Sequence, residues 1–234
     1  MRFLALLAAS VGWAQNAPHI RDWRPPAGEP TASPRRACRD VHQMTGYDLT
    51  VLTAESGSFC RVTLLVQPEI RIEVSLPAGW NNRLYMFGNG GYAGESLEAP
   101  NRVANRNQAL SHGFVVAQTN TGHDAAKEPL ATFTVHPQKM ADYAFRSLHV
   151  TAESAKRVAE FYYGKRPARS YYNGCSTGGR QALILAQRYP EDFDGIIAGA
   201  PALDNVSNRL RALATYQAVA KNALCHQSSR SGVF

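Results

Sequence analysis

Apolar and polar residues alternate along several short segments in the first half of the chain, a pattern of period two that is typical of strands with one buried face. The clearest alternation covers residues 70–76, where four apolar side chains are separated by arginine, glutamate and serine. Shorter apolar runs bounded by turn residues predict further strands. These strands are expected over residues 51–53, 59–66, 83–87, 114–118, 170–172 and 194–201.

Helical periodicity dominates the second half. Over residues 139–163, apolar side chains recur at steps of three and four, which predicts one amphipathic helix. Gly164 follows directly and is the residue type that most often ends a helix. Helices are also expected over 181–189 and 203–224. Because strands alternate with helices in this half, the sequence predicts an α/β fold with a parallel sheet.

A G-x-S-x-G motif lies between the predicted strand 170–172 and the predicted helix 181–189, with Ser176 at its centre. Strand, tight glycine turn, serine and helix in this order form the nucleophile elbow of the α/β-hydrolase fold. The turn is so sharp that side chains two residues before and after the serine collide with neighbouring backbone. The motif therefore predicts Ser176 as a catalytic nucleophile at a helix N-terminus.

A serine nucleophile of this kind needs preorganised donors for the oxyanion that forms when it attacks a carbonyl. The N–H of Thr177, directly after the serine, is the first expected donor. The second is expected in the glycine-rich segment 88–94 that follows the predicted strand 83–87, with Gly91 favoured and Gly90 next. A flexible glycine turn without a catalytic role is the alternative interpretation of that segment.

Two further residues are candidates for the substrate pocket. His123 follows the predicted strand 114–118 at its carboxyl end, the edge of a parallel sheet where ligands bind. Tyr92 lies within the glycine-rich segment. A loop histidine that is merely hydrogen-bonded explains His123 equally well.

The acid and base of a triad are harder to assign. The hydrolase order is serine, then acid, then histidine, and Asp204 and His226 are the weak candidates in that order. His226 follows Ser176 too closely to leave room for the two further strands that normally carry these groups. A short hydrolase using this pair remains an alternative.

Composition and charge favour a globular, exported protein and argue against a nucleic-acid-binding or membrane-spanning one. The hydrophobic fraction of 44% suits a globular domain, and the formal charge of +7 is scattered over the chain. Because no Lys/Arg stripe is interleaved with aromatic residues, nucleic-acid binding is not expected. A basic start followed by a short apolar run predicts a signal peptide over 1–14 and a secreted or periplasmic protein. No segment is long enough to predict a membrane span.

The chain has four cysteines: Cys38, Cys60, Cys175 and Cys225. Their spacing matches no zinc motif, and in an exported protein disulfides are the usual outcome. Cys38 and Cys60 bracket a predicted hairpin, so we expect them to pair. A bond between Cys175 and Cys225 stays open at this point.

Several motifs together resemble one family. They are the segments 174–181, 186–190, 192–196 and 199–202, supported by the glycine-rich segment 88–94. In these segments the chain is similar to the tannase and feruloyl esterase family, which also includes mono(2-hydroxyethyl) terephthalate hydrolase. The resemblance covers about residues 38–225, and a cysteine directly before the nucleophile makes it specific.

The resemblance implies an α/β-hydrolase core, a large inserted lid with a calcium loop, and hydrolysis of aromatic (phenolic) acid esters through a serine acyl-enzyme. It also implies that the cysteine beside the serine is bonded to a cysteine beside the catalytic histidine. Family members are about twice as long as this chain. We therefore expect a truncated fold, without the last strands, most of the lid, the triad Asp and His, or the calcium ligands. No cofactor is expected in this chain.

The expected organisation is a signal peptide at 1–14, an irregular arm at 15–37, an incomplete hydrolase core at 38–202, and the start of the lid with a divergent tail at 203–234. The tail is typical of a premature stop or a frameshift. The expected function is a secreted ester hydrolase that is impaired in this chain. The alternatives are a non-catalytic protein that binds phenolic ligands and a product that does not fold.

Overall fold

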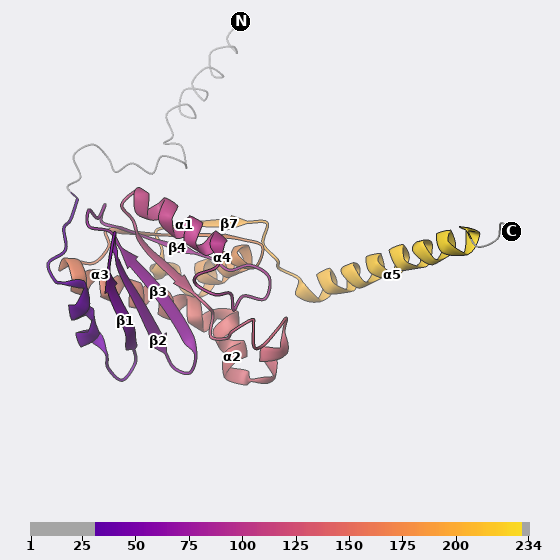
Figure 1. Cartoon of the computed structure of the whole chain (residues 1–234), viewed down its shortest axis with the longest axis horizontal. Coiled ribbons are helices and arrows are strands. Elements are labelled where there is room, and N and C mark those ends of the chain that lie inside the picture. Colours follow the sequence, from indigo (N-terminus) through magenta and orange to yellow (C-terminus); the bar gives the residue numbers. More distant parts are fainter. Residues whose placement is uncertain (1–30, 231–234) are drawn as a thin grey trace, which may run out of the picture.

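The computed structural model describes residues 31–230, with side chains for all of them except residues 205 and 222–230. Its centre is a single seven-stranded sheet in the order β1-β2-β3-β5-β4-β6-β7 (Figure 1). The strands are β1 Thr50–Ser56, β2 Cys60–Val66, β3 Ile70–Leu76, β4 Arg83–Phe87, β5 Val115–Thr119, β6 Arg169–Cys175 and β7 Gly195–Gly199. The predicted signal peptide at 1–14 lies outside the described residues, as does most of the predicted arm.

The sheet is mixed. β1, β2, β3 and β5 pair antiparallel in turn, whereas β5, β4, β6 and β7 pair parallel. All seven predicted strands are present, and the predicted parallel arrangement holds for the later part of the chain. Parallel pairing brings the carboxyl ends of β4, β5 and β6 to one edge, where the loops that carry the candidate site begin.

Within residues 31–230, five α-helices accompany the sheet: α1 Pro100–Ser111, α2 Pro137–Ala141, α3 Ser147–Tyr163, α4 Thr177–Arg188 and α5 Asn205–Arg230. The alternation of side chains along β4 and β5 divides the core in two. Leu84, Met86 and Val115 pack on the side of α3, and Tyr85 and Val116 pack on the side of α1. The sheet is therefore covered on both faces.

The prediction of one helix over 139–163 is wrong in detail. The chain forms the short helix α2, then a π-helical turn over Asp142–Arg146, and then α3, which ends at Gly164 in the left-handed conformation. Asp142 is fully buried in the π-helical turn and accepts a hydrogen bond from Arg146 at 2.7 Å. The π-helical turn interrupts the α-helix, but apolar side chains continue at helical spacing across it, so the sequence pattern does not show the interruption.

Helix α1 was not predicted. It contains few apolar residues, and its buried positions include Arg102 and Arg106. Both arginines pair with carboxylates from elsewhere in the chain, Arg102 with Glu95 and Arg106 with Glu73. The inner face of α1 is thus charged, so a search for apolar periodicity does not find it.

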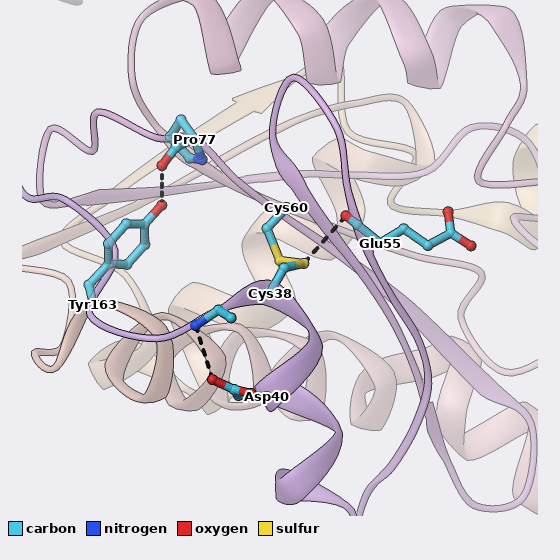
Figure 2. Close-up of a disulfide and its surroundings, with 7 residues drawn as sticks. Cys38, Asp40, Glu55, Cys60, Pro77 and Tyr163 are labelled. Carbon is cyan, nitrogen blue, oxygen red and sulfur yellow. Dashed lines mark hydrogen bonds between the residues drawn. A yellow bond between two sulfur atoms is a disulfide. The ribbon is translucent and has the colours of Figure 1, made fainter.

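The predicted disulfide between Cys38 and Cys60 is present, with the two Cα atoms 5.5 Å apart. It joins the 3₁₀ helix Cys38–Met44 to the start of β2 (Figure 2). Nearby, the Tyr163 hydroxyl at the end of α3 donates to the Pro77 carbonyl at 2.6 Å. The N-terminal part of the described chain is thereby fixed to the sheet.

Helix α5 extends away from the layered domain (Figure 1). Its described apolar side chains, Val206, Leu210, Leu213, Tyr216 and Val219, are exposed. None of the helices within residues 31–230 combines the length and apolar character needed to cross a lipid bilayer.

Candidate active site

Ser176 occupies the sharp turn between β6 and α4. Its backbone has φ 59° and ψ −115°, a conformation that side-chain-bearing residues rarely adopt and that costs about 1–3 kcal/mol. Three backbone hydrogen bonds of 3.0 Å hold it: the Ser176 N–H donates to Gly199 O, and the Ser176 carbonyl accepts from the N–H groups of Arg180 and Ala202. The side chain is exposed at the start of α4. This geometry is that of a nucleophile elbow.

Two glycines that flank Ser176, Gly174 of the motif and Gly179 directly after it, are required by close approach. A Cβ atom on Gly174 would lie 2.3 Å from the carbonyl oxygen of Gly178, and one on Gly179 would lie 2.3 Å from the carbonyl oxygen of Gly199. Both distances are far below van der Waals contact. The first glycine lets the turn close on itself, and the second lets α4 pack directly against β7.

The glycine-rich segment 88–94 lies beside the elbow. The Thr177 hydroxyl donates to the Gly91 carbonyl, which joins this loop to the first residue of α4. Gly91 has a left-handed φ of 49°. Within the described part of the chain, neither the Thr177 N–H nor the Gly91 N–H has a hydrogen-bond acceptor, whereas the Gly90 N–H donates to Glu95 Oε1 at 2.7 Å.

Hydrogen bonds to side chains from α1 and α4 hold this loop in place. Asn89 donates its N–H to Gln181 Oε1 at 2.9 Å and its side-chain amide to Glu95 Oε2 at 2.8 Å. Arg102, which is 2% exposed, donates to the Gly88 carbonyl at 3.2 Å and to Glu95 Oε2 at 3.3 Å. None of these four side chains was predicted from the sequence, because no motif marks a contact between α1, α4 and the loop.

The two residues predicted to line the substrate pocket, His123 and Tyr92, differ in burial. His123 is fully buried and stacks on Phe133 with 3.9 Å between ring centroids. Burial lowers the pKa of His123, and the Glu128 carboxylate opposes this shift. Tyr92 is half-buried, with the Arg209 guanidinium carbon 4.7 Å from its ring centroid. A pocket role for either residue stays a prediction.

No acid or base partner of Ser176 emerges among the described side chains, since no histidine or carboxylate there hydrogen-bonds to its hydroxyl. Asp204 is exposed and accepts from the Ser207 N–H at 3.0 Å, which places it at the start of α5. Hydrogen bonding from the Ser207 side chain, followed by that from its N–H, lowers the pKa of Asp204. Cys175 is an exposed free thiol. The side chains of Cys225 and His226 lie outside the described residues, so their predicted roles stay predictions.

Comparison with known proteins decides the family. A family model described as tannase and feruloyl esterase matches residues 54–228. The chain belongs to the tannase and feruloyl esterase family. It is 37% identical over 149 residues to a probable feruloyl esterase B-2 of Aspergillus flavus, covering 62% of this chain and 27% of that protein. It is 38% identical over 169 residues to an esterase of Xanthomonas campestris, covering 70% of this chain and 28% of that protein.

A solved family structure supports the same conclusion. The crystal structure of feruloyl esterase B from Aspergillus oryzae matches with a TM-score of 0.60 and 28% identity, over 70% of this chain and 36% of that one. In each comparison the chain spans well under half the length of its relative. The α/β-hydrolase fold of the described part is thereby shown, and the predicted resemblance is confirmed.

Proposed function

We propose that this chain is the nucleophile-bearing part of a serine carboxylic ester hydrolase that acts on esters of aromatic acids through an acyl-enzyme. One observation carries the proposal: Ser176 lies in a strained elbow, its neighbour Thr177 contacts the Gly91 carbonyl, and neither the Thr177 N–H nor the Gly91 N–H has an acceptor among the described residues. Membership of the tannase and feruloyl esterase family supports the reaction type, and the feruloyl esterase relatives support the aromatic acyl group.

The proposed reaction begins when Ser176 Oγ attacks the ester carbonyl carbon. The N–H groups of Thr177 and Gly91 donate to the oxyanion that forms, and such a donor is worth about 10²–10³ in rate. The serine proton passes to a base and then to the departing alcohol, which leaves an acyl-serine ester. Water attacks that ester, and the acid is released as Ser176 recovers its proton.

The base is the missing part of this scheme. The described residues offer no base in contact with Ser176, so we expect slow turnover of ordinary esters by this chain alone. Removing a triad member costs several orders of magnitude in rate but leaves the contribution of the oxyanion hole. Within residues 31–221, no group of three or more His, Cys, Asp or Glu side chains could hold a metal ion.

We also propose export from the cytoplasm. The Cys38–Cys60 disulfide supports this proposal, because such bonds persist in oxidising compartments.

The test uses an ester whose leaving group needs no protonation. Purified chain mixed with para-nitrophenyl ferulate should release a burst of para-nitrophenolate stoichiometric with protein. The burst should be absent in Ser176→Ala and retained in Ser58→Ala, which changes an exposed serine in the turn between β1 and β2. An equal burst in Ser176→Ala contradicts the proposal. Binding of the ester with no burst favours the alternative of a phenolic-ligand-binding protein.

A further inference from the structure

Glu95 is the only carboxylate, among the described residues, that accepts a backbone N–H from the glycine-rich segment 88–94. It lies between that segment and α1, and its side chain is 26% exposed. Oε1 accepts from the Gly90 N–H at 2.7 Å, and Oε2 accepts from Asn89 Nδ2 and Arg102 Nη2. A charge-assisted hydrogen bond of this length is about twice as strong as a neutral one. The Gly90 N–H is therefore held toward Glu95.

Three other positions of the loop, Gly88, Asn89 and Gly91, are held by side chains from α1 and α4. Gly88 is held through its carbonyl by Arg102, and Asn89 is held at its N–H and its side-chain oxygen by Gln181. The Gly91 carbonyl is held by the Thr177 hydroxyl. With its neighbours fixed in this way, the Gly91 N–H is the one amide of residues 89–91 that has no acceptor in the described structure.

We propose that Glu95 is a positioning residue for the oxyanion hole. By taking the Gly90 N–H, it selects Gly91 as the donor of the loop and sets that donor opposite the Thr177 N–H. Arg102 keeps Glu95 in place, since it bridges Glu95 to the Gly88 carbonyl from a buried position. This inference rests on the proposed function, because it assigns a donor for the oxyanion formed at Ser176.

Positioning of an oxyanion donor has a kinetic signature that differs from a loss of folding. The oxyanion exists in the transition state and not in the bound ester, so a displaced donor lowers the maximal acylation rate constant and leaves ester binding unchanged. A variant that merely unfolds part of the population lowers the number of reactive sites and leaves the rate constant of the folded molecules as it was.

The experiment follows acylation of Ser176 by para-nitrophenyl acetate over a range of ester concentrations, in the full chain and in three variants. Glu95→Ala should lower the maximal acylation rate constant about 10- to 100-fold, with half-saturation within about threefold of the parent chain. Glu95→Gln should lose less than Glu95→Ala, because its amide oxygen can still accept from the Gly90 N–H, although its amide nitrogen cannot accept from Asn89 and Arg102. Glu98→Gln, a carboxylate on the same connection that does not contact the loop, should acylate at the parent rate.

An unchanged rate constant in Glu95→Ala overturns the inference, as does a loss confined to the number of reactive sites. Equal losses in Glu95→Ala and Glu95→Gln overturn it too, because they indicate a need for charge and not for an acceptor. Failure of the parent chain to acylate at Ser176 overturns the proposed function, and this inference with it. The two failures are therefore distinguishable.

Discussion

The Glu73 carboxylate gives the sharpest prediction of stability. It is 1% exposed on β3 and pairs with Arg61 at 2.6 Å and with Arg106 at 3.0 Å. The Arg106 side chain is 8% exposed on the inner face of α1. Glu73→Gln keeps the shape of the side chain and removes its charge, so two guanidinium groups lose their shared partner.

The size of the effect follows from these distances. At these separations and an effective dielectric constant of about 20, each pair attracts by about 6 kcal/mol before the cost of desolvation, and breaking a buried pair costs about 3–5 kcal/mol net. Glu98 contacts Arg61 and lies 3.8 Å from Arg106, so it offsets part of the loss. We expect Glu73→Gln to lower the free energy of unfolding by about 3 kcal/mol. With a urea m-value of about 2 kcal/mol/M, the midpoint falls by about 1.5 M.

Urea unfolding followed by circular dichroism measures this change. Glu98→Gln is the matched control, because its side chain is 52% exposed, and it should cost less than about 1 kcal/mol. A loss below about 1 kcal/mol in Glu73→Gln, at an unchanged m-value, would refute the reasoning that a buried charge pair holds α1 to the sheet.

Three further changes test other parts of the structure. Gly174→Ala should abolish acylation of Ser176 and lower the unfolding midpoint, because the new Cβ meets a backbone oxygen at 2.3 Å; parent-like acylation would contradict this. Replacing Cys38 and Cys60 together by serine should cost about 3 kcal/mol in urea unfolding, and no loss would show that loop closure contributes nothing. Burial lowers the pKa of His123, so its contribution to stability is present above its unfolded pKa of about 6.5 and is lost as the pH falls. Between about pH 7 and pH 5, stability should therefore fall less in His123→Gln than in the parent chain, and equal slopes would contradict the assignment.

The sequence predicts those parts of the fold in which local pattern and packing agree. Strand β3 alternates with period two because its apolar face packs on α3, but the expectation of a single buried face is wrong, since Glu73 and Ser75 on the other face are buried too. The elbow is visible because Gly174 and Gly178 bracket Ser176. Helix α1 escapes prediction because Arg102 and Arg106 occupy its inner face. Arg102 pairs with Glu95, which precedes α1, and Arg106 pairs with Glu73, which lies on β3. Only the folded chain therefore shows why these two arginines are buried.

In the candidate site too, the sequence predicts the residues of a local motif and misses those that depend on tertiary contacts. The motif predicts Ser176 and the N–H of Thr177 as site groups, since both follow from a turn that is local in sequence. The choice between Gly90 and Gly91 needs the contact with Glu95, which depends on where α1 places Arg102. A base for Ser176 is identified neither by the sequence nor by the described side chains, because triad members are brought together by tertiary structure alone.

Ser176 is proposed above as the nucleophile of an ester hydrolase. The most direct test is irreversible labelling of the folded chain with an aryl phosphonate ester, followed by peptide mapping in a mass spectrometer. Our account predicts one adduct, on Ser176, which disappears in Ser176→Ala and is unaffected by Ser58→Ala. Labelling of another serine at an equal rate, or no labelling of Ser176 in folded protein, would contradict the claim.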